Sequence, residues 1–195
     1  MKWTDLSQHI FWLSSRALGV TALVLVSLSV GLGLALASKL VRGPGVPARV
    51  KRLHEATALT ALIAIAAHGL VLLGDSYLRP SLADLALPFA MGDQPLWTGV
   101  GIIGGWLAAI LGLSFYVRRW FGPGLWRKAH RFTLLVWVLG VAHTLGSGTD
   151  AGSGWLQLIL ALTGLPIVFL ATMRFLPRER KPPRVPRVAQ QEALP

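Results

Sequence analysis

Cysteine is absent from this chain of 195 residues, and charged residues are scarce. The lack of cysteine excludes disulfides, thiolate-bound iron–sulfur clusters and thiol nucleophiles. Charged residues make up 14% of the chain, against about a quarter in an average soluble domain. Because 53% of the residues are hydrophobic, this shortage of charge predicts a protein whose surface largely faces lipid.

The apolar residues form five blocks of helical length, which predicts an all-α, polytopic membrane helix bundle. A spanning helix needs about 20 apolar residues, and a helix pairs all its backbone groups internally. The five expected spans are residues 10–36, 53–73, 97–117, 129–145 and 155–175. They form one domain over residues 1–176, and the Pro- and Arg-rich tail over residues 177–195 is expected to be disordered.

Lysine and arginine are unevenly distributed among the segments between these spans. Residues 37–52, residues 118–128 and the tail carry most of them, whereas residues 74–96 carry only Arg79 and residues 146–154 carry none. Basic loops stay in the cytoplasm, so the N-terminus is expected outside and the C-terminus inside. The net charge of +11 is explained by this topology, and we expect membrane lipid rather than nucleic acid as the partner.

Four histidines lie within the expected spans, where ionisable side chains are costly and usually functional. His54 and His68 are fourteen residues apart, and His130 and His143 are thirteen apart. At 1.5 Å per residue the separations are roughly 21 and 20 Å, so two parallel helices would place an inner and an outer pair. A haem iron takes one axial ligand from each side, which predicts two b-type haems.

Two details of this arrangement are less regular. Thirteen residues leave His130 and His143 about 140° apart on an ideal helix. A rotated haem, a helix distortion near Gly140 or a ligand from a loop could absorb the offset, and the sequence does not decide among them. Arg16 lies inside the first span and is expected to bind a propionate of the outer haem, since guanidinium matches carboxylate; the alternative is a side chain that extends to the interface.

This pattern resembles the ferric reductase-like transmembrane domain, a superfamily that includes NADPH oxidases, ferric reductases and the haem subunit of the periplasmic methionine sulfoxide reductase system. The resemblance rests on the two histidine pairs and on W-R-K-A-H at residues 126–130. S-R-A-L-G at residues 15–19 and H-T-L-G-S-G-T-D at residues 143–150 add weaker support. The resemblance covers about residues 10–175 and implies a standalone bacterial member in the inner (plasma) membrane. It also implies that the iron ligands are His54, His68, His130 and His143.

The expected function is electron transfer through b-type haem to an acceptor on the outer face, which the sequence does not identify. We expect no flavin or nicotinamide site in this chain, so a separate reductase, flavoprotein or quinol would be the donor. Whether the chain acts as an enzyme, as a haem oxidoreductase subunit, is left open. The alternative is a non-redox transporter or scaffold whose histidines bind a metal or relay protons.

Overall fold

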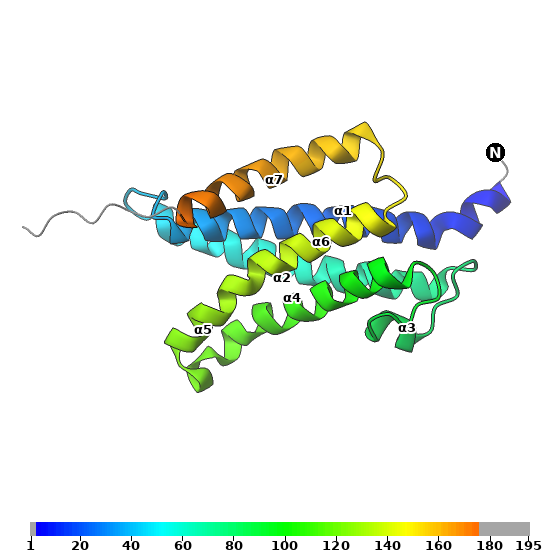
Figure 1. The fold of residues 1–195 in the computed structure, drawn as a ribbon, viewed down its shortest axis with the longest axis horizontal. Helices are drawn as coiled ribbons and strands as arrows, with labels where there is room; N and C mark the ends of the chain where they lie inside the picture. Colours follow the sequence, from blue (N-terminus) through cyan, green and yellow to red (C-terminus); the bar gives the residue numbers. More distant parts are fainter. Residues whose placement is uncertain (1–2, 176–195) are drawn as a thin grey trace, which may run out of the picture.

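A computed structural model describes residues 3–175, with the side chains of residues 9–174, and all regular secondary structure in this part of the chain is helical. The long helices run along one axis of an elongated bundle (Figure 1). Four of them have apolar stretches long enough to cross a membrane. These are α1 (Trp3–Ala37), α2 (Val46–Val71), α4 (Pro95–Phe121) and α7 (Gly154–Phe175). The predicted membrane helix bundle is therefore confirmed at this level, while the expected tail lies outside the described residues.

The expected fifth span, over residues 129–145, corresponds to a shorter helix, α6 (Thr133–Ser147). Its 15 residues are fewer than the roughly 20 that cross a bilayer. The helix α5 (Pro123–Ala129) and the 3₁₀ turn η2 (His130–Phe132) precede it without a gap and lengthen the helical segment. The structure thus supports four spans, and a count of five stays a prediction.

The segment between α2 and α4 contains structure that the sequence analysis did not anticipate. It begins with a 3₁₀ turn, η1 (Leu72–Gly74), and includes the short helix α3 (Leu82–Ala86). Ser81 and Asp84 form a reciprocal capping box at the start of α3. The backbone N–H of Ser81 donates to the Asp84 carboxylate, and so does the Ser81 hydroxyl. These two hydrogen bonds, the backbone one more strongly, hold the pKa of Asp84 below its usual range. The S-x-x-D pattern at residues 81–84 could have predicted this helix start.

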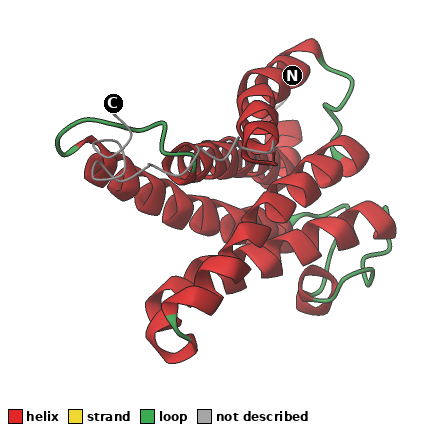
Figure 2. Ribbon diagram, turned by 60° about the vertical axis from the view of Figure 1, so that its left-hand side comes forward, coloured by secondary structure: helices red, strands yellow, loops and turns green. Residues whose placement is uncertain are grey.

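The bundle is built from two helix hairpins and one outer helix. Helices α1 and α2 pack against each other along their length, and α4 packs against α6. Helix α7 lies against α1, on the side away from α4, and continues through Pro166 without a break (Figures 1 and 2). Helices α2 and α6 run in the same direction, as the sequence analysis expected for the two histidine-bearing segments.

One stretch of α4 has the letters of a dinucleotide-binding motif, which the sequence analysis did not note. Gly99, Gly101 and Gly104 match the letters G-x-G-x-x-G. A dinucleotide loop joins a strand to a helix N-terminus, whereas these glycines lie inside α4 and no strand occurs in residues 3–175. These glycines instead allow close packing: Gly99 faces the Phe89 ring, and Gly101 and Gly104 face His143 and Leu139 of α6.

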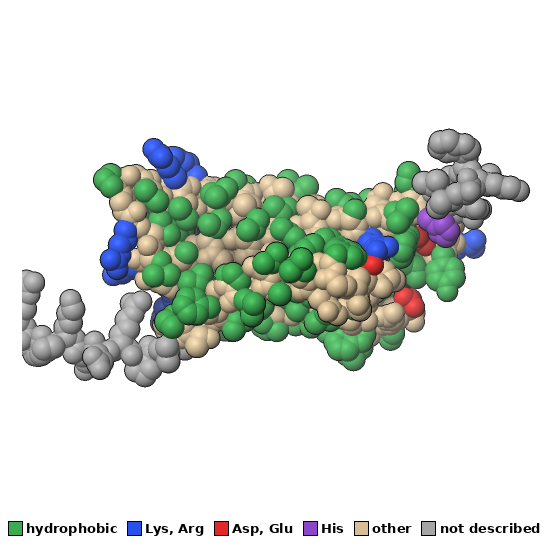
Figure 3. Space-filling view, turned by 90° about the horizontal axis from the view of Figure 1, so that it is seen from above, with side chains coloured by type: hydrophobic (Ala, Val, Ile, Leu, Met, Phe, Trp, Pro, Cys, Tyr) green, Lys and Arg blue, Asp and Glu red, His purple; other side chains and the backbone are tan. Residues whose placement is uncertain are grey.

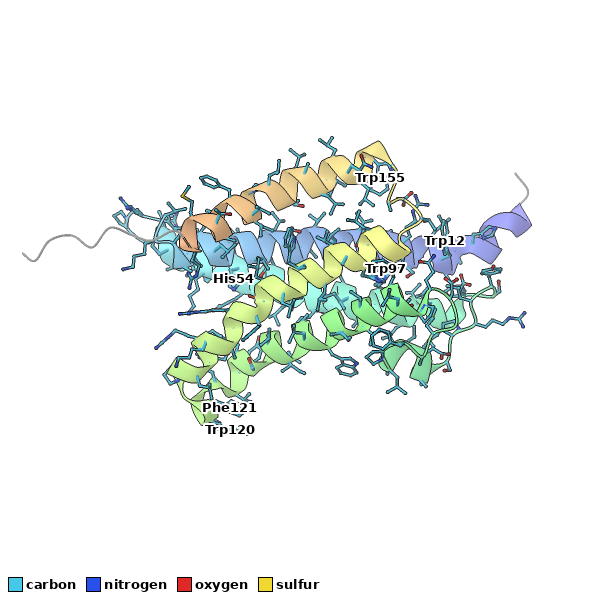
Figure 4. All side chains as sticks on the ribbon, viewed as in Figure 1. Trp12, His54, Trp97, Trp120, Phe121 and Trp155 are labelled. Atoms are coloured by element: carbon cyan, nitrogen blue, oxygen red, sulfur yellow. The ribbon has the colours of Figure 1, made fainter. Side chains whose placement is uncertain are left out.

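The two ends of the bundle differ in charge. Lys and Arg side chains gather at the end where α1 joins α2, and acidic side chains are visible at the opposite end (Figure 3). Aromatic side chains occur near both ends: Trp12, Trp97 and Trp155 near the acidic end, and Trp120 and Phe121 near the basic end (Figure 4). This distribution is typical of the two interfaces of a membrane protein.

Candidate functional site

The four histidines of α2, η2 and α6 form two facing pairs. The ring centroids of His54 and His130 are 6.1 Å apart, with an interplanar angle of 86°. Those of His68 and His143 are 6.2 Å apart, at 71°. All four residues are half-buried. These are the pairs that the spacing places at common levels; we call His54–His130 the inner pair and His68–His143 the outer pair.

His68 of the outer pair is held by Ser15 of α1. The Nδ1 atom of His68 lies 2.7 Å from the Ser15 carbonyl oxygen and 3.0 Å from its hydroxyl oxygen. The same hydroxyl donates to the backbone carbonyl of His68 at 2.9 Å. Because a carbonyl oxygen only accepts, Nδ1 must carry a proton, and in the neutral imidazole Nε2 is then unprotonated.

His54 of the inner pair is held in the same way by Ser29, fourteen residues further along α1. Its Nδ1 donates to the Ser29 carbonyl oxygen at 2.8 Å, with the hydroxyl oxygen at 3.1 Å. Helices α1 and α2 are antiparallel, so equal intervals of fourteen residues keep both contacts in register. The two histidines of α2 therefore present the same tautomer.

Glycines allow the rings of α2 to lie directly against the backbone of α1. A Cβ atom on Gly19 would meet the His68 ring at 3.0 Å, and one on Gly33 would meet the His54 ring at 3.3 Å. Each glycine follows its serine by four residues, one helical turn. The stretches S-R-A-L-G and S-V-G-L-G of α1 are thus two copies of one contact.

His143 is held by a related contact on α4. Its Nδ1 donates to the carbonyl oxygen of Trp97 at 2.9 Å. Gly101, four residues after Trp97, faces the ring so closely that a Cβ atom would lie 2.6 Å from Nδ1. Both imidazoles of the outer pair therefore have a protonated Nδ1 and an unprotonated Nε2.

His130 departs from this arrangement. Its Nδ1 is buried and has no hydrogen-bond partner, although the backbone of Leu111 lies nearby. The ring stacks on Trp126, with centroids 4.8 Å apart and planes at 25°. Trp126 in turn packs edge-on against Phe115 and donates through Nε1 to Ser114 Oγ at 3.2 Å. The inner pair is therefore asymmetric, with one ring bonded to a carbonyl and the other held by stacking.

The 3₁₀ turn η2 explains how thirteen residues reach the same two levels as fourteen. A 3₁₀ turn rises about 2.0 Å per residue, against about 1.5 Å in an α-helix. Its three residues extend the His130–His143 interval to roughly 21 Å, the length of the His54–His68 interval. The extra rotation of 3₁₀ residues also cuts the angular offset from about 140° to roughly 80°. The distortion lies at His130–Phe132, whereas Gly140 is inside the regular helix α6.

A small apolar core separates the two levels. Its buried residues are Ala108, Leu111 and Val136, and partly buried side chains from α1, α2 and α4 pack around them. Val136 lies between His130 and His143 in the chain, and the flanking residue Leu62 lies between His54 and His68. Apolar side chains therefore lie between the two levels.

The donor sets fit two axially ligated haems. Two imidazole nitrogens bound to one metal ion at about 2 Å hold their ring centroids roughly 6 Å apart. Within the described part of the chain, no group of three or more His, Cys, Asp or Glu side chains comes together. A bare zinc site needs about four protein ligands, whereas a porphyrin supplies four nitrogens itself and leaves two axial positions. A Nδ1–H bond to a carbonyl is also the usual support of a metal-bound imidazole.

Arg16 has a protein partner that the sequence analysis missed. Its guanidinium forms a bidentate ion pair with Asp150, in the segment between α6 and α7, and lies 5.2 Å from the Trp12 ring centroid. Asp75 follows His68 by seven residues, as Asp150 follows His143. It instead accepts backbone N–H bonds from Tyr77 and Leu78. The contact between Arg16 and a haem propionate stays a prediction.

The sequence analysis also missed the residues that hold the histidines. The two S-x-x-x-G stretches of α1, at residues 15–19 and 29–33, share the fourteen-residue interval of His54 and His68. That common interval was the available signal. Nothing comparable marks Trp97, because its contribution is a backbone carbonyl.

In comparisons with known proteins, no family model, no curated protein and no solved structure matches this chain. The case for its function therefore rests on the geometry of its own residues.

Proposed function

We propose that this membrane protein carries electrons between the two faces of a bilayer through two b-type haems, in the manner of the ferric reductase-like family that its sequence resembles. The observation that carries the proposal is that four imidazoles face each other in two pairs, one at each level of the bundle. The ring centroids within each pair are about 6 Å apart. His54 and His130 would hold one haem, and His68 and His143 the other.

When bound, haem supplies one-electron chemistry that amino-acid side chains lack. The residues of this chain contribute binding and orientation. The carbonyls of Ser15, Ser29 and Trp97 keep three imidazoles in the tautomer whose Nε2 can ligate iron. The apolar core lies between the two levels and provides a low-dielectric interior there.

The charge distribution supports a direction for the transfer. His54 of the inner pair lies toward the basic end of the bundle, which matches the cytoplasmic face under the positive-inside rule (Figures 3 and 4). A separate reductase, a flavoprotein or quinol would deliver electrons there or within the membrane, and an acceptor would take them at the outer face. The bacterial inner membrane is the proposed location.

The alternative is a transporter or scaffold in which the histidines relay protons or bind a bare metal ion. A proton relay needs donors and acceptors in a continuous chain. The side chains of Ala108, Leu111 and Val136 between the two pairs offer no such donor or acceptor. Ring centroids 6 Å apart also exceed the separation of directly hydrogen-bonded imidazoles, which favours an intervening ligand.

Visible spectroscopy of the purified protein tests the proposal. We expect a low-spin b-type spectrum on dithionite reduction and two haems per chain in a pyridine haemochrome assay. His68→Ala and His143→Ala should each remove one haem, and His9→Ala, at an exposed histidine, is the control. A colourless protein from haem-replete cells would refute the proposal, and one haem that survives all four histidine substitutions would refute the ligand assignment.

A further inference from the structure

Three of the four paired histidines are held by the same backbone arrangement. In each case Nδ1 donates to the carbonyl of one residue, and the ring faces the glycine one helical turn later. The three pairs of holding residues are Ser15 and Gly19 for His68, Ser29 and Gly33 for His54, and Trp97 and Gly101 for His143. We call this arrangement the carbonyl–glycine cradle.

We propose that the carbonyl–glycine cradle is the device that positions the ligand imidazoles of this protein, and that Trp126 replaces it at His130. Gly19, Gly33, Gly101 and Trp126 are then positioning residues that act through the histidines. This inference rests on the proposed function where it concerns haem. In the haem-free chain the cradle has a separate effect, because it favours the imidazole tautomer with the proton on Nδ1.

The geometry gives each cradle two separate effects. The carbonyl accepts from Nδ1 and thereby keeps the proton off Nε2. The glycine lets the imidazole lie against helix backbone, at distances of 2.6 to 3.3 Å from where a Cβ atom would stand. A methyl group there must push a rigid ring toward its partner histidine. Metal–ligand bonds tolerate only small displacements, so the substitution should weaken haem binding.

The fourth position shows what replaces the cradle. Leu111 and Phe115 lie fourteen residues after Trp97 and Gly101 on α4, where a fourth cradle would continue the interval. Phe115 is not a glycine, and its ring lies against Trp126 at a centroid distance of 5.8 Å. The His130 ring stacks on the indole, and its Nδ1 faces the Leu111 backbone without a hydrogen bond of normal geometry. The outer haem would therefore have two cradled ligands and the inner haem one.

The test compares glycine-to-alanine variants of the full chain with controls on the same helices. Gly19→Ala and Gly33→Ala are matched by Gly31→Ala, whose Cβ atom would meet its nearest neighbour at 3.9 Å. Gly101→Ala is matched by Gly105→Ala, at 3.5 Å. We expect about 10- to 100-fold weaker haem binding for the cradle variants and little change for the controls. Gly19→Ala and Gly101→Ala should alter the electron paramagnetic resonance signal of the outer haem, and Gly33→Ala that of the inner one.

A second measurement uses the haem-free wild-type chain and needs no variant to fold. The ¹⁵N shifts of its histidines should show protonated Nδ1 at His54, His68 and His143, and a mixture of tautomers at His130. Equal mixtures at all four would overturn the cradle, as would Gly19→Ala binding haem like Gly31→Ala. If the wild type binds no haem while the three tautomers are fixed, the cradle stands and the proposed function fails. If the wild type binds haem while the tautomers are mixed, the proposed function stands and the cradle fails.

Discussion

At the scale of single residues, polar side chains between the helices orient the histidines and fix how the helices pack. Ser15 and Ser29 are buried, and their hydroxyls bridge the ring and the backbone of a histidine on the next helix. Trp137 donates through Nε1 to Ser27 Oγ at 3.0 Å and joins α6 to α1 between the two levels. A buried polar group without a partner costs free energy, so each such bond also specifies one packing of the helices.

The Arg16–Asp150 ion pair yields a residue-scale prediction about stability. The side chains are 35% and 16% exposed, so the pair should be weaker than a fully buried one. We expect a coupling free energy of about 1 kcal/mol from a double-mutant cycle of Arg16→Gln and Asp150→Asn, measured by unfolding in detergent. A coupling of zero would mean that the pair does not form in the membrane protein.

The same variants test whether Arg16 also contacts the outer haem. If it binds a propionate, Arg16→Gln should shift the midpoint potential of the outer haem even when Asp150 has been replaced by asparagine. If Asp150 is its sole anionic partner, the shift should disappear in that background.

At the scale of elements, the 3₁₀ turn η2 adapts a thirteen-residue interval to a fourteen-residue one. The first hairpin uses regular α-helix on both sides, with Ser15 and Ser29 opposite His68 and His54. The second hairpin has one residue fewer between its histidines, and η2 supplies the missing rise. The local geometry of η2 thus decides whether His130 and His143 both lie opposite a histidine of α2.

This role of η2 predicts the effect of an insertion. One alanine inserted between Phe132 and Thr133 would rotate His143 by about 100° and move it about 1.5 Å along the axis relative to His130. We expect one of the two haems to be lost in a pyridine haemochrome assay. One alanine inserted after Gly152, in the segment between α6 and α7, is the control and should leave two. Two haems in the Phe132 insertion would contradict the role of η2.

At the scale of the whole molecule, the described helices have a small core and large apolar exteriors. Mid-helix side chains such as Ile63, Ile110, Leu162 and Leu165 are more than 60% exposed. In water such surfaces would aggregate, whereas lipid chains cover them without cost. The exterior of the bundle is therefore suited to contact with lipid, and the histidine pairs lie between its helices.

The absence of cysteine makes the orientation of the molecule directly measurable. Gly92, Gly124 and Gly152 have no atoms within 4 Å of where a Cβ would stand, so cysteine fits at each. With the N-terminus outside, Gly92→Cys and Gly152→Cys should react with a membrane-impermeant maleimide in intact cells, and Gly124→Cys only after permeabilisation. The wild-type chain is the unlabelled control. The opposite pattern would reverse the proposed orientation.

The sequence alone determined the class of protein and the candidate ligands. In lipid, apolar blocks of this length pair all their backbone groups as helices. The similar intervals of His54–His68 and His130–His143, fourteen and thirteen residues, already predicted four imidazoles at two levels, because helical rise converts sequence interval into distance. Tertiary structure decided what spacing cannot encode. The packing of the helices selects the backbone carbonyl that meets Nδ1 of His54, His68 and His143. It also brings Asp150 to Arg16, and the structure locates the helix distortion at His130–Phe132. Backbone carbonyls are identical in every residue, so only the packing of one helix on another selects among them.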